Sequence, residues 1–183
     1  MARFRQILDP SGAPLLATLY REITDCGLGD EVPLNWFTAQ GERPDILAGA
    51  WALTKGVLLE GVLPPTMKQM VVVLISAHNG CQYCRLTHAK ALQGLGVSSD
   101  LIDSLSTDVN LDKVPPPQRA ILQFALQVAQ APQAITDRDV QRLRDFSLSD
   151  GEILELIMVA AFTNFINTWS DISAIAIDEV GSP

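Results

Sequence analysis

The apolar residues of this chain recur three and four residues apart, and no run alternates apolar and polar residues convincingly enough to predict a strand. Such spacing puts the apolar side chains on one face of a helix. Glycines and prolines divide the chain into short periodic segments. We therefore predict an all-α fold, a single helical domain over residues 41–183 with an N-terminal helical arm over residues 1–40.

Caps and chain breaks set the predicted helix boundaries. The run 67–77 contains three consecutive valines, which favour a strand, but it follows a proline pair and lies between helical segments, so we predict a buried helix. A capping-box pattern at 149–152 precedes the longest predicted helix, which continues to about Ile177. The other helices are predicted within 12–28, 43–60, 81–93, 100–105, 118–130 and 137–146.

Charge and composition exclude several classes of protein. The chain has a formal charge of −8, with 48% apolar and 19% charged residues, which suits a compact fold and disfavours nucleic acid or anionic lipid as partners. The N-terminal MARFRQILDPSG does not resemble a signal peptide. The charge-free run 156–170 is expected to be too short and too polar to span a bilayer. We predict a cytoplasmic protein, whose three cysteines are free, catalytic or metal-bound rather than a disulfide framework.

The stretch NGCQYCRLTHAKAL, residues 79–92, holds the most unusual cluster. Cys81, Cys84 and His88 follow each other at i, i+3 and i+7, so all three side chains share one face of a helix. If Asn79-Gly80 breaks the chain, both cysteines lie in the first helical turn. The helix dipole there favours a thiolate and lowers the pKa of a thiol.

This arrangement contains the groups that redox chemistry of thiols requires. A thiolate attacks disulfides and peroxides. A second cysteine one turn away can trap a sulfenic acid as a disulfide before further oxidation. A histidine on the same face can take and return the proton. The cluster therefore predicts an enzyme, a thiol-dependent peroxidase or disulfide oxidoreductase.

Other interpretations remain open from the residues alone. His78, Cys81, Cys84 and His88 offer two nitrogens and two sulfurs for a tetrahedral zinc ion, although four ligands from one short segment make awkward geometry. Such a protein would be a zinc-binding structural module. The cysteines could also be buried small hydrophobic residues beside a satisfied histidine. A redox sensor whose disulfide changes assembly is a further alternative.

The segment 65–91, PTMKQMVVVLISAHNGCQYCRLTHAKA, resembles the carboxymuconolactone decarboxylase superfamily, and within it the alkylhydroperoxidase D-like and peroxidase-related branch. The Asn-rich stretch 161–171, which ends in an aspartate, is also similar, so the resemblance loosely covers residues 40–177. It implies an all-helical fold that assembles into homo-oligomers, trimers or hexamers. It also implies a hydroperoxide or disulfide substrate and a dithiol reductant such as a lipoyl carrier protein, with no cofactor and no metal.

The resemblance also assigns roles by position. Cys84 is expected to attack the peroxide, Cys81 to be the resolving and partner-facing thiol, and His88 to belong to the proton relay. The family places a glutamate where this chain has Gln69, and an amide does not exchange protons as a carboxylate does. Gln69 can still orient His88 or a water, and His78 is a candidate substitute in the relay.

Some residues have two competing interpretations. Asn164, Asn167 and Asp171 recur at three and four spacing, so they either line the active pocket, make subunit contacts or form a solvated stripe. Tyr83 either packs or donates a hydrogen bond to substrate, with packing favoured. Three aromatic residues are expected to pack the N-terminal arm: Trp36, Phe37 and Trp51.

Overall fold

The computed structural model describes residues 2–108 and 110–178. Within these residues the chain is helical and forms no strand beyond one isolated bridge between Gly29 and Pro33, so the all-α prediction is confirmed. The elements are α1 (Pro14–Asp25), α2 (Asn35–Thr38), α3 (Pro44–Thr54), a π-helical turn η1 (Lys55–Leu59), α4 (Pro65–Asn79), α5 (Gln82–Gly94), α6 (Ser99–Thr107), α7 (Pro116–Gln130), a 3₁₀ turn η2 (Pro132–Ala134), α8 (Asp137–Asp145) and α9 (Asp150–Ser173).

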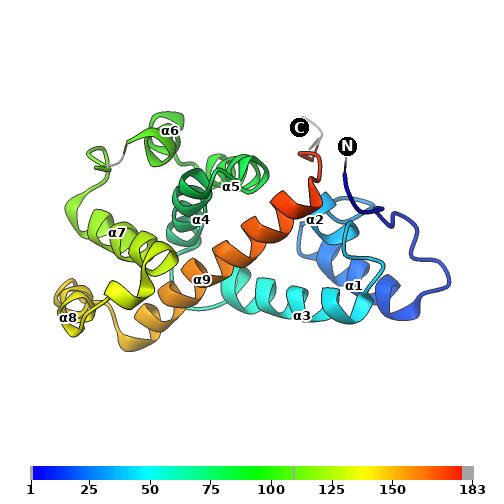
Figure 1. Cartoon of the computed structure of the whole chain (residues 1–183), viewed down its shortest axis with the longest axis horizontal. Helices are drawn as coiled ribbons and strands as arrows, with labels where there is room; N and C mark the ends of the chain where they lie inside the picture. Colours follow the sequence, from blue (N-terminus) through cyan, green and yellow to red (C-terminus); the bar gives the residue numbers. More distant parts are fainter. Residues whose placement is uncertain (1, 109, 179–183) are drawn as a thin grey trace.

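Helix α4 is the centre of the fold and packs against α5, α6, α7 and α9 (Figure 1). Its residues 71–75 are 0–1% exposed. A helix that is covered on every side needs no polar face, and this is why its sequence showed no helical periodicity and resembled a strand. The prediction of a buried helix is confirmed.

The N-terminal residues pack against the rest of the molecule through aromatic side chains. Helix α1 lies against α3, and Trp36, Phe37 and Trp51 make successive edge-to-face contacts with ring centroids 5.0 and 6.0 Å apart. The Trp51 indole N–H also donates a hydrogen bond to Glu22 Oε2, at 3.0 Å. Helix α2 was not predicted, because four residues are too few to show a helical period.

Two predicted helices differ from the observed ones at their C-terminal ends. The segment 43–60 forms α3 and then widens into the π-helical turn η1. Helix α9 ends at Ser173, four residues before the predicted end, because Ala174 adopts a left-handed conformation with φ 50°. The Arg3 guanidinium donates hydrogen bonds to the carbonyl oxygens of Asp171 and Ile172. The N-terminal segment thus provides partners for carbonyl groups that lack one inside the last turn of α9.

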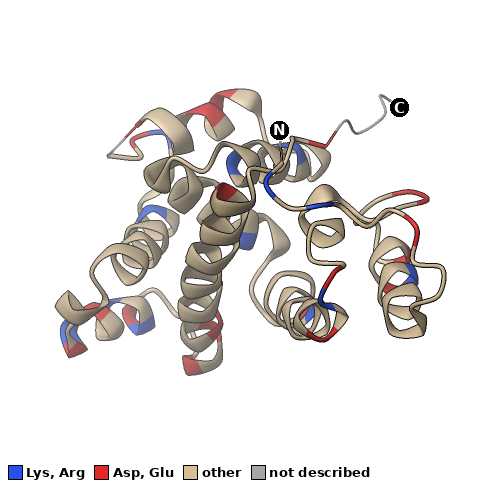
Figure 2. Cartoon of the chain, turned by 45° about the vertical axis from the view of Figure 1, so that its right-hand side comes forward, with Lys and Arg blue, Asp and Glu red and all other residues tan. Residues whose placement is uncertain are grey.

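Helix α9 crosses the molecule diagonally in Figure 1. It has 24 residues, and among the described helices it alone is long and apolar enough to cross a membrane by length and composition. The expectation concerned only the charge-free run 156–170, and the helix that contains this run is longer. However, half of its most apolar 18-residue window is buried, as in a core helix. Figure 2 shows acidic residues near both ends of this helix and none between, and no cluster of basic residues in this view.

Candidate functional site

The junction between α4 and α5 sets the position of both cysteines. Gly80 ends α4 in the left-handed conformation, with φ 75°, which glycine adopts without strain. The N–H of Cys81 then bonds back to the Ser76 carbonyl oxygen, at 2.9 Å. Cys81 is the N-cap of α5 and Cys84 lies three residues later, so both thiols lie in the first turn, as the spacing predicted. No disulfide links them.

The pKa values of the two thiols are shifted in opposite directions. The pKa of Cys84 is lowered, first by the hydrogen bond from the Cys81 thiol and further by Ser170, although burial opposes this. The pKa of Cys81 is raised, first because its proton is held in that hydrogen bond and second because the thiol is buried. The Ser170 hydroxyl lies 3.2 Å from Cys84 Sγ. Of the two thiols, Cys84 therefore ionises more readily than Cys81.

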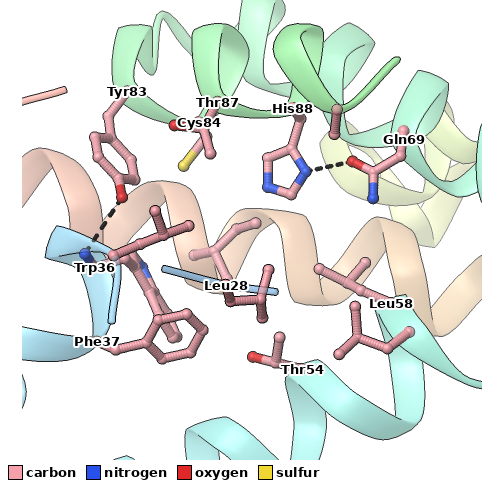
Figure 3. A pocket seen from close by; sticks show the side chains of 14 residues that line it. Leu28, Trp36, Phe37, Thr54, Leu58, Gln69, Tyr83, Cys84, Thr87 and His88 are labelled. Atoms are coloured by element: carbon pink, nitrogen blue, oxygen red, sulfur yellow. Dashed lines mark hydrogen bonds between the residues drawn. The ribbon is translucent and has the colours of Figure 1, made fainter. Parts of the chain in front are cut away.

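His88 lies one turn beyond Cys84 on α5 and contacts Gln69 of α4. Its Nδ1 is 2.5 Å from Gln69 Oε1, and because a carbonyl oxygen only accepts, Nδ1 carries the proton. The other ring nitrogen faces the pocket as a hydrogen-bond acceptor (Figure 3). Burial lowers the pKa of His88 to about 4, so the imidazole is neutral at physiological pH.

Cys84, His88 and Gln69 line one cavity of about 120 Å³. Apart from these three, its walls are largely aliphatic and aromatic, and they come from the loop before α2 and from α2, α3, η1, α5 and α9 (Figure 3). The other lining residues are Leu28, Leu34, Trp36, Phe37, Thr54, Leu58, Leu59, Tyr83, Thr87, Ala91 and Ile166. Cys81 is 0% exposed and does not line the cavity. The cavity therefore presents one sulfur, that of Cys84, to a small apolar ligand.

Residues 44–109 match the Carboxymuconolactone decarboxylase family. This stretch contains Gln69, both clustered cysteines and His88. Over this stretch the chain is similar to the carboxymuconolactone decarboxylase superfamily. The chain matches none of the curated protein sequences with which it was compared.

Solved structures of similar proteins extend the likeness of this chain beyond residues 44–109. A peroxidase-related protein from Ralstonia eutropha JMP134, an alkylhydroperoxidase AhpD core, is 24% identical with a TM-score of 0.81, and the alignment covers 96% of this chain and 95% of that chain. A peroxidase-related protein from Silicibacter sp. TM1040 is 23% identical with a TM-score of 0.82, covering 98% and 96%. A cysteine-to-alanine variant of the debrominase Bmp8, in complex with 2,3,4-tribromopyrrole, is 20% identical with a TM-score of 0.78, covering 98% and 95%.

At these identities the likeness establishes the fold, which is of the alkylhydroperoxidase D-like helical type. Because the alignments cover nearly the whole chain, they include most of the first 40 residues, which the sequence resemblance had left out. The superfamily includes enzymes, and these relatives differ in the activity their names state.

Two residues of the polar stripe on α9, Asn164 and Asn167, belong to an internal hydrogen-bond network. Asn79, at the end of α4, donates to Asn164 Oδ1 at 2.9 Å and to Asn167 Oδ1 at 2.8 Å. The Asn167 amide in turn donates to the Ser76 hydroxyl, at 2.9 Å. Neither asparagine lines the cavity, and Asp171 is exposed. Asn164 and Asn167 thus join α9 to the α4–α5 junction behind the cysteines, whereas Asp171 is exposed to solvent.

Sequence reasoning missed several residues of the site. Ser170 is 2% exposed and contacts the Cys84 sulfur. The sequence did indicate Ser170, because it lies three residues after Asn167 and therefore on the same face of α9. Trp36 and Phe37 were expected only to pack, yet both also line the cavity. Tyr83 lines it too, but its hydroxyl donates to Asp178 Oδ2, at 2.5 Å, which favours the packing interpretation.

His78 is not brought together with the other predicted site residues. It lies exposed near the C-terminal end of α4 and does not line the cavity, whereas Cys84 and His88 do. Among residues 2–108 and 110–178, no three or more His, Cys, Asp or Glu side chains are grouped to hold a metal ion. The four residues of the zinc alternative therefore do not converge. The site offers two neighbouring thiols, of which Cys84 has the lowered pKa, and a neutral imidazole beside an apolar cavity.

Proposed function

We propose that this protein is a thiol-dependent hydroperoxidase of the superfamily, active in antioxidant defence in the cytoplasm. The observation that carries the proposal is the placement of the cysteine pair: Cys84, whose pKa is lowered, lines the cavity, and Cys81, whose pKa is raised, is buried behind it. A peroxidase of this kind needs a nucleophile that the substrate can reach and a second thiol that reacts afterwards.

The reaction has three balanced steps. The Cys84 thiolate attacks the outer peroxide oxygen, the O–O bond breaks, and the leaving alkoxide takes a proton, which gives an alcohol and a Cys84 sulfenic acid. The Cys81 thiol then displaces water from this sulfur and forms the disulfide. A dithiol reductant, such as a lipoyl group on a carrier protein, restores both thiols and becomes a disulfide itself. His88 lies beside Cys84 in the cavity wall. Its neutral imidazole holds its proton on Nδ1 toward Gln69, so it can deliver a proton to the alkoxide only in its protonated form.

The cavity supports an organic hydroperoxide as the substrate. Its walls are largely apolar, and its volume of about 120 Å³ is close to that of an engineered protein cavity, roughly 150 Å³, that holds benzene. An alkyl or small aromatic group fits such a space better than water does, because apolar surface is removed from solvent on binding. Hydrogen peroxide gains nothing from these walls.

A homo-oligomer is part of the proposal, with a trimer or hexamer expected from the resemblance. The support is an exposed apolar face along α9, where the spacing of four and seven residues aligns large side chains. These side chains are Leu154, Met158, Phe165 and Ile172, which are between 41% and 66% exposed. Light scattering measures the mass in solution, and a monomer at all concentrations contradicts this part.

The test is multiple-turnover consumption of cumene hydroperoxide with dithiothreitol as reductant. Wild type is expected to turn over, and Cys84→Ser to lose turnover completely because its nucleophile is absent. Cys81→Ser is expected to react once and to stop at a Cys84 sulfenic acid, which dimedone traps for mass spectrometry. Cys26→Ser is the matched control, because Cys26 is exposed and does not line the cavity.

Two results contradict the proposal. If Cys84→Ser consumes peroxide as fast as wild type, Cys84 is not the nucleophile. If wild type oxidises once and does not turn over with any dithiol, while its mass in solution changes, the protein is a redox sensor.

A second candidate is reductive removal of halogen from a small aromatic ring. It is favoured by the cavity, whose size suits such a ring beside a thiolate, and by the likeness to Bmp8. The balance is similar: a carbon–bromine bond becomes carbon–hydrogen, bromide leaves, and two thiols become a disulfide. Bromide release from 2,3,4-tribromopyrrole under the same conditions distinguishes the two functions.

A further inference from the structure

A second, larger cavity lies directly beside the one that holds Cys84. This outer groove has a volume of about 540 Å³ and is lined by residues 27–35 together with Thr87, Lys90, Ala91 and Asp178. It shares four lining residues with the inner cavity: Leu28, Leu34, Thr87 and Ala91. We call these four residues the neck, because they lie between the two spaces.

The two sides of the neck belong to different elements. One side is a loop held by backbone hydrogen bonds, and the other is a face of helix α5. Leu28 and Leu34 lie in the loop before α2, where the Leu34 N–H donates to the Leu28 carbonyl oxygen at 3.0 Å. The Leu28 N–H is in turn tied to Ile23 of α1, at 3.2 Å. Thr87 and Ala91 are four residues apart on α5, so they share one helical face. The width of the neck therefore depends on how the loop is held against α5.

The carboxylate of Asp178 makes the connection between these two sides. Its Oδ1 accepts the N–H of Asn35, directly after Leu34, at 2.7 Å. Its Oδ2 accepts the hydroxyl of Tyr83 on α5, at 2.5 Å. Lys90, also on α5, donates to the Asp178 carbonyl oxygen at 3.3 Å. One residue of the C-terminal segment thus bonds to both walls of the neck.

The bond to Tyr83 is well placed to persist. Burial, followed by the charge of Asp178, raises the pKa of Tyr83, so its hydroxyl stays protonated and donates. The same hydroxyl oxygen accepts the N–H of Trp36, at 3.3 Å, and Trp36 lines the inner cavity. Loss of the Asp178 carboxylate would therefore loosen both the neck and a wall of the cavity behind it.

We propose that Asp178 is a positioning residue that fixes the width of the neck, and that the neck selects ligands for Cys84 by their cross-section. Where the proposed peroxidase function holds, on which the substrate class rests, unbranched organic hydroperoxides pass more readily than branched ones. A longer ligand would extend from the inner cavity into the outer groove. The selection acts on access to the sulfur and leaves the chemistry at Cys84 unchanged.

Thiol labelling tests the neck without any peroxidase activity. In a Cys26→Ser background, the rate of Cys84 modification is measured by mass spectrometry with slender iodoacetamide and with bulky N-pyrenylmaleimide. Asp178→Ala is expected to speed the bulky reagent by about tenfold, since loss of charge-assisted hydrogen bonds shifts local opening by that order. Iodoacetamide is expected to change by less than about twofold. Asp178→Asn is expected to give a smaller change of the same kind.

Two further variants make the test selective. Leu34→Ala widens the neck directly and keeps every Asp178 bond, so it is expected to speed the bulky reagent even if Asp178→Ala does not fold. Asp45→Asn is the control, because Asp45 is an exposed carboxylate that pairs with Arg43 away from both cavities. It is expected to leave both rates unchanged.

The proposal is overturned if Asp178→Ala and Leu34→Ala speed both reagents equally, because this means general loosening, or if they speed neither. With peroxide, the neck predicts that KM for branched cumene hydroperoxide falls more in these variants than KM for an unbranched alkyl hydroperoxide. If no form of the protein consumes peroxide but the labelling ratio shifts as described, the neck is supported and the proposed peroxidase function fails.

Discussion

Replacing Gln69 with glutamate tests the proton relay at its one departure from the family pattern. His88 Nδ1 lies 2.5 Å from Gln69 Oε1, so a glutamate there would put a carboxylate against the imidazole. An opposite charge at this distance raises a histidine pKa by about 1–3 units. Since burial holds the pKa of His88 at about 4 in the wild type, Gln69→Glu is expected to raise it to the range 5–7, by this order of shift.

The magnitude of the rate change follows from the protonated fraction. At pH 7, a histidine with a pKa of about 4 is protonated in about one molecule in a thousand. A rise of two units increases this fraction about a hundredfold. If His88 protonates the leaving alkoxide in the slow step, the kcat/KM of Gln69→Glu should rise by about ten- to a hundredfold, since a stronger base is also a weaker acid.

The assay combines enzyme kinetics with NMR titration. The chain has only two histidines, and His78 is exposed, so the two imidazole signals are easily distinguished and His78 is an internal reference. Gln93→Glu is the matched control, because it adds the same charge at an exposed position of α5. It should change neither the titration of His88 nor the rate.

One result would refute this reasoning. If NMR shows that the pKa of His88 has risen in Gln69→Glu while kcat/KM stays at the wild-type value, proton delivery by His88 does not limit the reaction. The proton then comes from another group or from water.

Three further predictions concern the thiolate, acid stability and the buried ion pair. Ser170→Ala removes the contact between the hydroxyl and the Cys84 sulfur and should raise the pKa of Cys84, read from the pH dependence of iodoacetamide labelling; an unchanged profile contradicts a role for the contact. The neutral His88 should make the protein lose up to about 3 kcal/mol of stability as pH falls from 6.5 to 4, because the unfolded state binds the proton first; denaturant melts of His88→Gln should lack this loss. Glu155→Gln should destabilise by about 3–5 kcal/mol, because it leaves the ammonium of Lys68, which is 2% exposed, without its partner; a double variant with Lys68→Met should recover most of this in thermal melts.

The cysteine cluster could be predicted from sequence because its geometry is local. Three residues at i, i+3 and i+7 share a face in any α-helix, and Gly80 marked where that helix begins. The buried helix α4 was also predictable, although its apolar run resembled a strand, because neighbouring breaks and helical segments decided the choice. Local rules were sufficient where one segment contained the whole pattern.

The rest of the site depends on contacts between distant segments. Ser170 reaches Cys84 across 86 positions in the chain, and Asp178 reaches Tyr83 across 95. No helical period relates such residues, and an unpaired serine or aspartate in a sequence does not reveal its partner. Helix α2 is shorter than two turns, so its placement comes from the aromatic packing of Trp36 and Phe37 and not from its own sequence pattern.

In the proposed reaction, a glutamine at position 69 in place of glutamate is expected to affect the departure of the alkoxide and not the formation of the nucleophile. Formation of the nucleophile needs no carboxylate here, because the Cys81 thiol and Ser170 already lower the pKa of Cys84. In the proposed reaction the departing alkoxide needs an acid, and burial keeps His88, beside Gln69, neutral. A hydroperoxide whose alkoxide is a weak base needs less help from this acid, so the rate should depend more on the leaving group in wild type than in Gln69→Glu. A series of hydroperoxides with alcohols of graded acidity measures this dependence, and equal slopes for the two proteins would show that His88 takes no part in the departure.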